Sequence, residues 1–357
     1  MSRCKVAVLG GYYTKWLLSE LSRGAEVLVV QPPRLRGMRV EGARVLNLKD
    51  DKAVTLLRAL KEVGCGRVVS MCDHDNEAFD HSQVREALGS GSEFVHHPIF
   101  TTVVCGDKVL SKTLFDMIGV PTPPWSCTGR TSFGTRGVIE KTRLGWGGRG
   151  IHALAKHGSL PSRPPEGTYW EAFIPGREIT AVVLAAGDRW QLWPLVDKGQ
   201  ADGHTHPLER IRIAPAELPD ATHRLIIQSI DRAVAALKPF GMIDFDFVID
   251  DMGVPLLLEI NSRISGASLL SMASTSRSIF AELLRIGGRE WDPGEVEPIY
   301  VAMEVPVPKV FMEDEICRRG YWHFQRRESP HAIGRVIVRH MCRDQVLEEV
   351  RDLLPFV

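Results

Sequence analysis

Two short apolar runs in the second half of the chain carry oxygen-bearing side chains at alternate positions. They are Ile243–Val248 and Leu256–Asn261, and the segment Asp250–Gly253 between them is typical of a tight turn. Because strand side chains alternate between two faces, a hairpin here would gather the oxygen-bearing residues on one face. These residues are Asp244, Asp246, Glu259 and Asn261, with Phe245, Phe247, Leu258 and Ile260 behind them in a core.

This oxygen-rich face predicts a magnesium site, since Mg²⁺ prefers hard oxygen ligands. The alternative is the polar outer face of a two-layer sheet. Against it, three carboxylates with no basic residue in their midst would repel one another without a metal. Asp244 and Asp246 both qualify as the ligand on the first strand. Arg263 shares the face of Asn261 if the strand continues, and it is placed to hold an anion.

A second group is the glycine-rich segment Gly145–Gly150, which follows Lys141 by four residues. Glycines let a loop close over phosphates and present backbone N–H groups, while a lysine supplies a point charge. A flexible hairpin is the alternative. The segment matches neither the dinucleotide fingerprint nor the phosphate loop ending in Gly-Lys-Ser/Thr, and it lies between two predicted strands.

A third group is the hinge Tyr169–Glu178, in which one predicted strand ends and another begins. Free backbone groups and an acidic side chain at such a hinge suit an adenine and a ribose, but the motif by itself favours an ordinary turn. Of the remaining polar segments, Asp197–Arg212 is a candidate substrate-reading loop or a solvated surface loop, with Lys198, Arg210 and Arg212 as its basic residues.

Three further motifs have two interpretations each. His204 and His206 have the spacing of metal ligands, but no third ligand is evident. Asp73–Asp75 follows a predicted parallel strand at its carboxyl end, where α/β sheets bind ligands, so Asp75 either caps the next helix or contacts a co-substrate. Gly10–Tyr12 lies at the equivalent place after the first strand.

The elements that position these residues fall into two styles. Strand and helix alternate in the first hundred residues, which predicts a parallel sheet with helices on both faces: strands Lys5–Leu9, Glu26–Val30 and Arg67–Ser70, and helices at about 13–21, 52–63 and 76–88. After the helix Asp107–Ile118, the proline-rich linker Val120–Pro124 must be extended. Antiparallel strands then follow at Val138–Lys141, Ile151–Leu154, Thr168–Ala172, Glu178–Ala185 and Trp190–Val196.

The last third returns to helices. We expect helices at Ala221–Leu237, Leu269–Leu284 and Asp344–Leu354, strands at Tyr300–Val305 and Val336–Arg339, and the hairpin described above between them. The 357 residues suffice for two or three domains. Lys plus Arg and Asp plus Glu balance at 44 each, which favours neither nucleic acid nor a membrane surface as a partner. No signal peptide or membrane span is evident, and seven scattered cysteines favour reduced thiols in the cytoplasm.

The order of these groups along the chain resembles the ATP-grasp superfamily, in which two α+β lobes close on ATP. Four motifs carry the resemblance: Asp107-Lys108-x-x-x-Lys112 with Gly119–Pro123, Val138–Lys141 with its glycine loop, the hinge, and Glu259–Arg263. The last is similar to the family's E-x-N-x-R magnesium strand. Ala332–Ile337 resembles the small C-terminal lobe of carboxylase-like and carboxylate–amine ligase members. Among these members are D-alanine–D-alanine ligase, biotin carboxylase and L-amino acid ligase.

The resemblance implies a role for each matching residue. Lys108, Lys141 and the loop residues Gly147 and Gly148 would contact the ATP phosphates. Glu171, Phe173 and Ile174 would flank the adenine and Glu178 would hold the ribose. Asp246, favoured over Asp244 by counting back from Glu259, would bind two Mg²⁺ ions with Glu259 and Asn261, with Mn²⁺ as a substitute. Arg263 and Lys141 would act in catalysis, Arg263 on the substrate carboxylate.

The implied architecture is an N-terminal Rossmann-like domain over 1–106, a two-lobed ATP-grasp domain over 107–295 that divides near 170, and a C-terminal lobe over 296–357. The implied reaction joins a carboxylate to an amine through an acyl-phosphate, with release of ADP and phosphate. Amino acids are the substrates that the resemblance suggests. A homodimer is common in such families. A carboxylase, an acyl-CoA synthetase and a non-catalytic ATP-binding module remain as alternatives.

Overall fold

The computed structural model describes most of the chain. The described residues are 6–21, 26–38, 40–89, 93–128, 133, 137–145, 150–154, 161–201, 210–289, 291–307, 322–325 and 334–353. Among them, no helix combines the length and the apolar character that crossing a membrane requires. The cysteines within these residues are free thiols: Cys65, Cys72, Cys105, Cys127 and Cys342.

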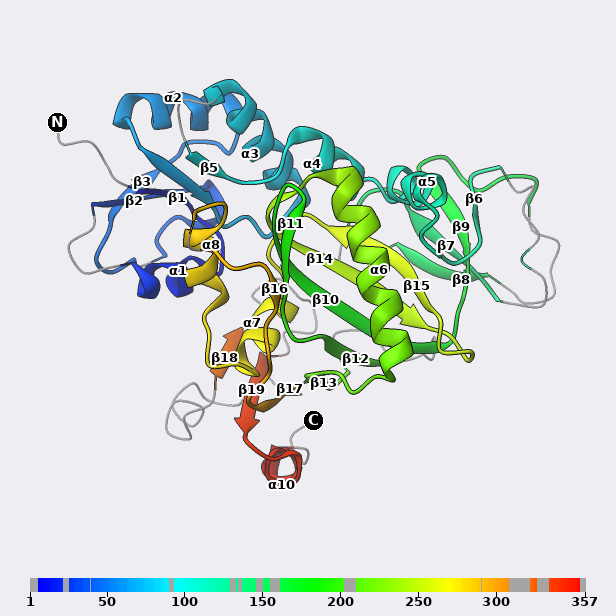
Figure 1. Cartoon of the computed structure of the whole chain (residues 1–357). Helices are drawn as coiled ribbons and strands as arrows, with labels where there is room; N and C mark the ends of the chain where they lie inside the picture. The colour runs from blue at the N-terminus through cyan, green and yellow to red at the C-terminus, as the bar shows by residue number, and fades with distance from the viewer. Residues whose placement is uncertain are drawn as a thin grey trace.

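The N-terminal part is a five-stranded parallel sheet in the order β3-β2-β1-β4-β5 (Figure 1). Its strands are β1 Val6–Leu9, β2 Val27–Gln31, β3 Arg44–Asn47, β4 Arg67–Ser70 and β5 Glu93–Val95. The helices α1 Thr14–Glu20, α2 Ala53–Val63 and α3 Asp75–Leu88 alternate with them, and the 3₁₀ turn η1 covers Pro33–Leu35. The predicted α/β architecture is therefore confirmed, and β1 and β2 are buried on both faces as parallel strands require.

Two helices lead from this sheet into a four-stranded antiparallel sheet. They are α4 Ile99–Gly106 and α5 Lys108–Ile118. Asp107 caps α5 by accepting hydrogen bonds from the backbone N–H groups of Val109 and Leu110, and Gly119 ends it in the left-handed conformation (φ 66°). The sheet has the order β6-β9-β7-β8, formed by β6 Trp125–Ser126, β9 Thr168–Ala172, β7 Val138–Thr142 and β8 Ile151–Leu154.

A ten-stranded sheet forms the rest of the molecule. Its main path is β15-β14-β10-β12-β13-β17-β19-β18, made of Pro255–Asn261, Phe240–Ile249, Gly176–Ala186, Val196–Ala201, Arg212–Ala214, Val301–Val307, Gly334–His340 and Trp322–Gln325. β11 Arg189–Leu192 and β16 Gly294–Glu295 lie beside it. Helix α6 Asp220–Leu237 covers one face (Figure 1), and α7 Gly266–Ala273 and α8 Ile279–Arg285 pack on the other.

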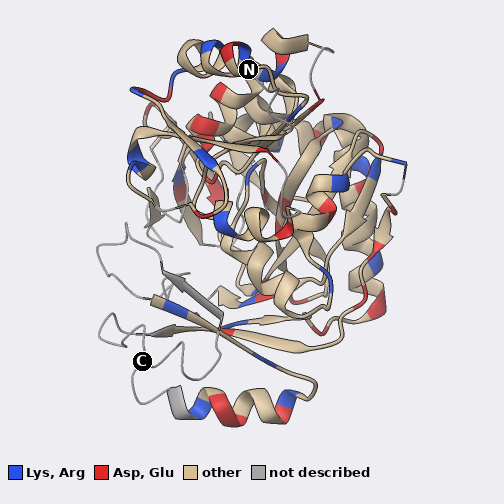
Figure 2. Cartoon of the chain, turned by 90° about the vertical axis from the view of Figure 1, so that its left-hand side faces the viewer, with Lys and Arg blue, Asp and Glu red and all other residues tan. Residues whose placement is uncertain are grey.

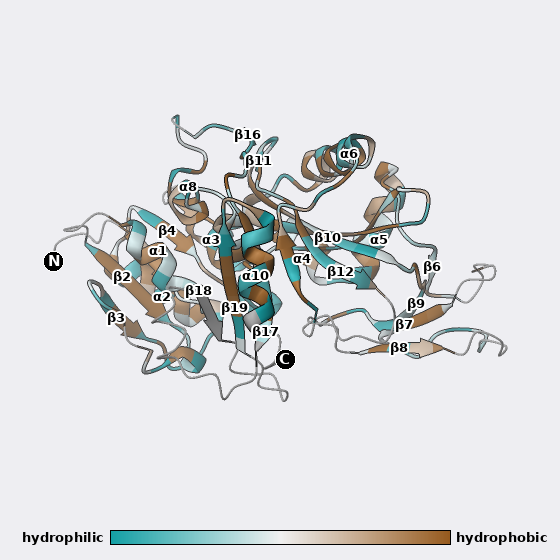
Figure 3. Ribbon diagram, turned by 90° about the horizontal axis from the view of Figure 1, so that it is seen from below, coloured by the Kyte–Doolittle hydropathy of each residue, from teal (hydrophilic) through white to brown (hydrophobic). Residues whose placement is uncertain are grey.

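The C-terminal strands are hydrogen-bonded into this sheet through β13 and β17. Helix α10 Arg343–Leu353 lies across β17 and β19 (Figure 3) and presents charges of both signs to solvent (Figure 2). The domain limits near residues 106 and 295 remain predictions.

Two predicted elements are wrong because each is two elements. The strand expected at Trp190–Val196 is split into β11 and β12, and Pro194 stands in the break. The helix expected at Leu269–Leu284 is split into α7 and α8, with the segment 274–278 between them. There Thr275 bonds the backbone carbonyls of Met272 and Arg277, and Ser278 caps α8. Hydroxyl side chains that bond the local backbone compete with a continuous helix.

The predicted hairpin is present, with one correction. β14 and β15 pair with Asp246 opposite Glu259 and Phe247 opposite Leu257, so a bulge displaces one residue of β15. Leu258 consequently packs on the side of Trp170 and Val138 rather than behind the acidic face. Leu257 takes the expected place beside Ile260. The bulge returns Glu259 and Asn261 to the face of Asp246.

Candidate functional site

The four oxygen-bearing residues of the hairpin lie together as predicted. Asp246 opposes Glu259 and Asp244 opposes Asn261 across the two strands. The Asn261 amide donates to Asp246 Oδ2 at 3.3 Å, and Thr180 of β10 donates to Oδ1 at 2.5 Å. Such a cluster of carboxylate and amide oxygens has the donor chemistry that Mg²⁺ requires.

The expectation of no basic residue among these carboxylates is wrong. Lys198 of β12 places Nζ 2.9 Å from Asp246 Oδ1, and Lys108 of α5 places Nζ 3.9 Å from Glu259 Oε2. Burial disfavours the ionised form of Glu259, but Lys108, Lys141, Lys198 and Arg263 outweigh it and hold its pKa at about 2. The hairpin sequence gave no sign of this because the lysines come from other elements.

A buried ion-pair network joins α5 to the four-stranded sheet. Glu171 of β9 lies 2.6 Å from Lys112 Nζ and 2.5 Å from Lys141 Nζ, and it is only 1% exposed. Burial raises the pKa of Glu171, but the two lysines more than reverse this and lower it. Burial lowers the pKa of Lys112 to about 8 even beside Glu171. Glu171, expected to flank the adenine, is thus engaged by lysines.

Lys112 ends the Asp107–Lys112 motif of the family resemblance, but it was assigned no role from the sequence. Its signal is its place on α5, since it follows Ser111 and precedes Phe115 on the buried side of the helix. It also donates to Thr122 Oγ1 at 2.6 Å, which ties the helix to the extended linker. Lys108, one turn earlier, donates to the Gly145 carbonyl at 2.5 Å. Gly147 and Gly148 of the glycine loop lie outside the described residues.

The hinge residues take up three different environments. Ile174 is buried in the cluster of Val138 and Trp170, and Phe173 N–H donates to the Gly137 carbonyl at 2.7 Å. Glu178 lies at the start of β10 and pairs with Arg210 at 3.2 Å. Arg210 therefore belongs to the site rather than to a separate surface loop. His204 and His206 lie outside the described residues.

Arg263 connects the end of β15 to helix α3 of the N-terminal part. Its Nε donates to Asp75 Oδ1 at 2.7 Å and its Nη2 donates to Asn261 Oδ1 at 3.2 Å. The interpretation of Asp75 as a helix cap is wrong, since the N-cap of α3 is His74 and Asp75 is the first helical residue. Asp75 is instead the counterion of Arg263, which the sequence separates by 188 positions.

The carboxyl ends of β1 and β4 form a second polar cluster beside this pair. Arg34 binds Asp73 at 2.6 Å and Glu77 at 2.5 Å, and its guanidinium lies 5.0 Å from the centre of the Tyr12 ring. Tyr12 N–H donates to Asp73 Oδ2 at 3.1 Å. A side chain at the adjoining Gly11 would place Cβ 1.8 Å from the backbone carbonyl oxygen of Met71, which directly follows β4. Only glycine therefore fits there.

The C-terminal strands add a buried charge cluster at the edge of the site. Glu304 of β17 is 1% exposed and lies 2.8 Å from Arg335 and 3.3 Å from Arg212. Arg335 also donates to the Arg210 carbonyl at 2.9 Å. Arg212, expected in a substrate loop or on the surface, is thereby held against the central sheet.

Basic and acidic groups of α5 and of the sheets that contain β7 and β14 are therefore held in close ion pairs. Residues 105–267, a little under half of the chain, match the model of the ATP-grasp domain. This match agrees with the resemblance to the ATP-grasp superfamily.

Two relatives and one solved structure are similar to this chain over most of its length. The chain is 23% identical over 266 residues to the carbamoyl-phosphate synthase of Methanobrevibacter smithii, which covers 70% of this chain and 71% of that protein. It is 28% identical over 304 residues to the D-alanine–D-alanine ligase of Verminephrobacter eiseniae, covering 78% and 88%. Its fold is similar to that of the L-amino acid ligase from Bacillus licheniformis, with a TM-score of 0.80, 18% identity and coverage of 100% and 98%.

Proposed function

We propose that the protein is an ATP-dependent carboxylate–amine ligase that forms an amide bond through an acyl-phosphate. The observation that carries this proposal is the set of cations around the oxygen-bearing face. Lys108 lies 3.9 Å from Glu259, Lys198 lies 2.9 Å from Asp246, and Arg263 donates to Asn261 at 3.2 Å. So many positive groups around one acidic face suit a polyphosphate held with metal ions.

ATP-grasp enzymes use ATP and Mg²⁺, and the residues of this chain fit both. Asp246, Glu259 and Asn261 would hold the metal ions, which supply neutralising charge to the phosphates when bound. Lys108 and Lys141 would contact the phosphates, and Glu178 the ribose. Lys198 lies 2.9 Å from Asp246, so we infer that it shifts from this carboxylate toward a phosphate oxygen when nucleotide enters.

The chain's own groups account for orientation in both steps. In the first, a substrate carboxylate oxygen attacks the γ-phosphorus and ADP leaves. In the second, the amine attacks the acyl carbon, phosphate leaves and the amine loses a proton. Arg263 would hold the reacting carboxylate and the oxyanion that develops from it. Its bond to Asp75 at 2.7 Å fixes the guanidinium, so this stabilising charge is oriented before reaction.

Amino acids are the proposed substrates. The cluster of Tyr12, Arg34, Asp73 and Glu77 borders the Asp75–Arg263 pair and offers both signs of charge, which suits a zwitterion. D-Alanine–D-alanine ligase and L-amino acid ligase, by their names, join amino acids, and this supports the proposal by analogy.

The test is a product assay with Mg-ATP and amino acids supplied singly and in pairs. ADP and phosphate that rise only with a particular pair are the expected result. ADP formed with bicarbonate alone would replace the proposal with a carboxylase, and AMP would overturn the acyl-phosphate route. ATP binding without turnover on any of these pools would identify a non-catalytic module.

A further inference from the structure

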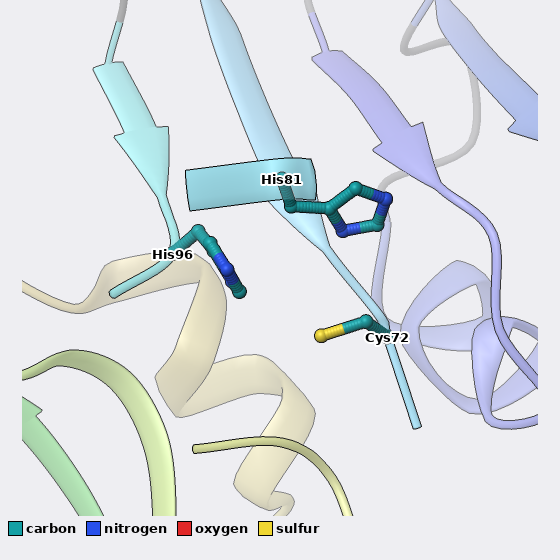
Figure 4. A group of neighbouring side chains, drawn as sticks. All are labelled: Cys72, His81 and His96. Atoms are coloured by element: carbon teal, nitrogen blue, oxygen red, sulfur yellow. The ribbon is translucent and has the colours of Figure 1, made fainter. Parts of the chain in front are cut away.

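Three buried side chains of metal-ligating type meet beside the carboxyl ends of β4 and β5. Cys72 follows β4, His81 lies in α3 and His96 follows β5 (Figure 4). Donor atoms of the three lie within 4.8 Å of one another, and all three residues are buried. A tetrahedral zinc ion holds such donor atoms roughly 3.5 Å apart. Side-chain rotations that move each donor atom by about an ångström would bring the three atoms to this spacing.

The hydrogen bonds around the two imidazoles differ. His96 Nε2 donates to the Ala78 carbonyl at 2.7 Å, which leaves the lone pair on Nδ1 for a ligand. Metal-binding histidines commonly have their second nitrogen fixed in this way. His81 Nδ1 lies on the side of Cys72 (Figure 4) and 2.8 Å from Ser70 Oγ, so Ser70 would release this nitrogen when a metal binds.

A small cavity adjoins the cluster. Its volume is about 10 Å³, and Cys72, His96, Ser262 and Arg263 are among the residues that line it. A volume of this size admits about one water molecule. Three protein ligands with room for one exchangeable ligand match an open zinc site rather than a closed structural one.

We propose that Cys72, His81 and His96 form a binding site for a thiophilic divalent cation of the zinc type. The mixture of one sulfur and two imidazole nitrogens favours Zn²⁺ over Mg²⁺, which takes oxygen ligands. On binding, the metal–sulfur bond forms as the S–H bond breaks, and the thiol proton passes to solvent. The site is distinct from the oxygen-ligand face and does not depend on the proposed ligase activity.

The alternative is a neutral core cluster with no ligand. Burial lowers the pKa of His81 to about 3 and that of His96 well below its usual value, and it raises the pKa of Cys72 to about 12. The imidazoles are therefore neutral, which is the form that binds metal. The Cys72 carbonyl accepts a hydrogen bond from Ile264 N–H at 3.1 Å. A metal here would thus brace the strand end that carries Arg263.

The test uses the full-length protein, freed of metal and titrated with Co²⁺ as a spectroscopic substitute for Zn²⁺. We expect about one equivalent to bind and to produce a thiolate-to-cobalt charge-transfer band in the near ultraviolet, which added Zn²⁺ abolishes. Absence of that band in the wild-type protein overturns the proposal without recourse to any variant.

Variants then assign the band to these residues. Cys72→Ala and His81→Gln should lose it, because each removes one of the three donor atoms. Cys105→Ala removes another buried thiol and should leave the band intact, as should Glu259→Gln on the oxygen-ligand face. A band that survives Cys72→Ala, or one lost with Cys105→Ala, would assign the metal elsewhere.

Discussion

The acidic face and the Cys72–His81–His96 cluster both bury titratable groups. These groups are ionised on the acidic face and neutral in the cluster. Glu171 and Glu259 each have basic side chains close by, and these partners outweigh burial. In the histidine cluster burial outweighs the nearby charges and holds the imidazoles and the thiol neutral. The same desolvation therefore gives ion pairs in one region and neutral ligands in the other.

This difference indicates what each region is able to exchange. An ion pair separates at modest cost when a ligand of matching charge replaces one partner, which suits phosphates and hard cations. A neutral imidazole or thiol offers a lone pair, which suits a softer cation. On the acidic face, some substitutions leave a charge without its partner and others remove a charge that has none. Both kinds should therefore change stability or turnover strongly, and the stability changes should depend on pH.

The largest effect is expected from Glu171→Gln, which leaves Lys112 and Lys141 without their shared counterion. Breaking a buried pair costs about 3–5 kcal/mol, and the free energy of unfolding from urea denaturation should fall by that amount. The pKa of Glu171 is lowered, because two lysines outweigh burial, so its contribution is complete above its usual pKa and is lost as the pH falls through the lowered value.

The difference between wild type and Glu171→Gln should consequently begin to shrink below about pH 4, where glutamate in the unfolded chain becomes protonated. It should be lost once the pH falls below the lowered pKa of the folded carboxylate. Glu166→Gln in the exposed turn before β9 is the control and should change stability by less than about 0.5 kcal/mol. A loss equal at all pH values would mean that packing, rather than the ion pair, is what Glu171 supplies.

Glu259→Gln should abolish turnover while leaving the fold intact. Removal of one negative ligand from a face built for cations should lower ADP formation at least about 100-fold. Circular dichroism and thermal unfolding in the absence of nucleotide report the fold, and the exposed Glu297→Gln serves as the control for the substitution itself. Turnover within a fewfold of wild type would remove Glu259 from the proposed metal site.

The contrast between the regions also explains what could be predicted from sequence. The hairpin was predictable because alternation and a turn signal are local, and Asp244, Asp246, Glu259 and Asn261 emerged together. The bulge at Leu258 was not, since it arises from pairing between strands. Lys198 and Lys112 were not assigned as counterions because their partners lie 48 and 59 positions away in sequence, at Asp246 and Glu171.

Asp244 is the exception on the charged side, and it sharpens the comparison. It is 1% exposed, and burial raises its pKa to about 7 although Ser265, Arg263 and Lys198 favour its ionised form. Since the folded pKa exceeds the unfolded value, wild-type stability should decline as the pH rises from about 4 to about 7. Asp244→Asn lacks the charge and should be more stable above pH 7 by on the order of 2 kcal/mol.

The measurement for Asp244→Asn is thermal or urea unfolding of the nucleotide-free protein at pH 4 and pH 8. The two proteins should coincide at the lower pH and diverge at the higher one. Asp250→Asn in the hairpin turn provides a comparison in which no buried charge is removed. An Asn variant that is destabilised equally at both pH values would show that the Asp244 carboxylate is paired in solution.

The smallest effect is expected from Asp75→Asn, which acts on the pair that joins the two regions. Asp75 is partly exposed, so loss of its charge should cost about 1 kcal/mol in orienting Arg263, or about fivefold in kcat/KM for the carboxylate substrate. The KM for ATP should stay unchanged, because Lys108 and Lys141 are untouched. Glu86→Gln, on an exposed part of the same helix, controls for the loss of one negative charge from α3. Equal losses with both variants would mean that α3 acts through its overall charge, whereas a rise in the KM for ATP with Asp75→Asn alone would move Arg263 from the carboxylate to the nucleotide.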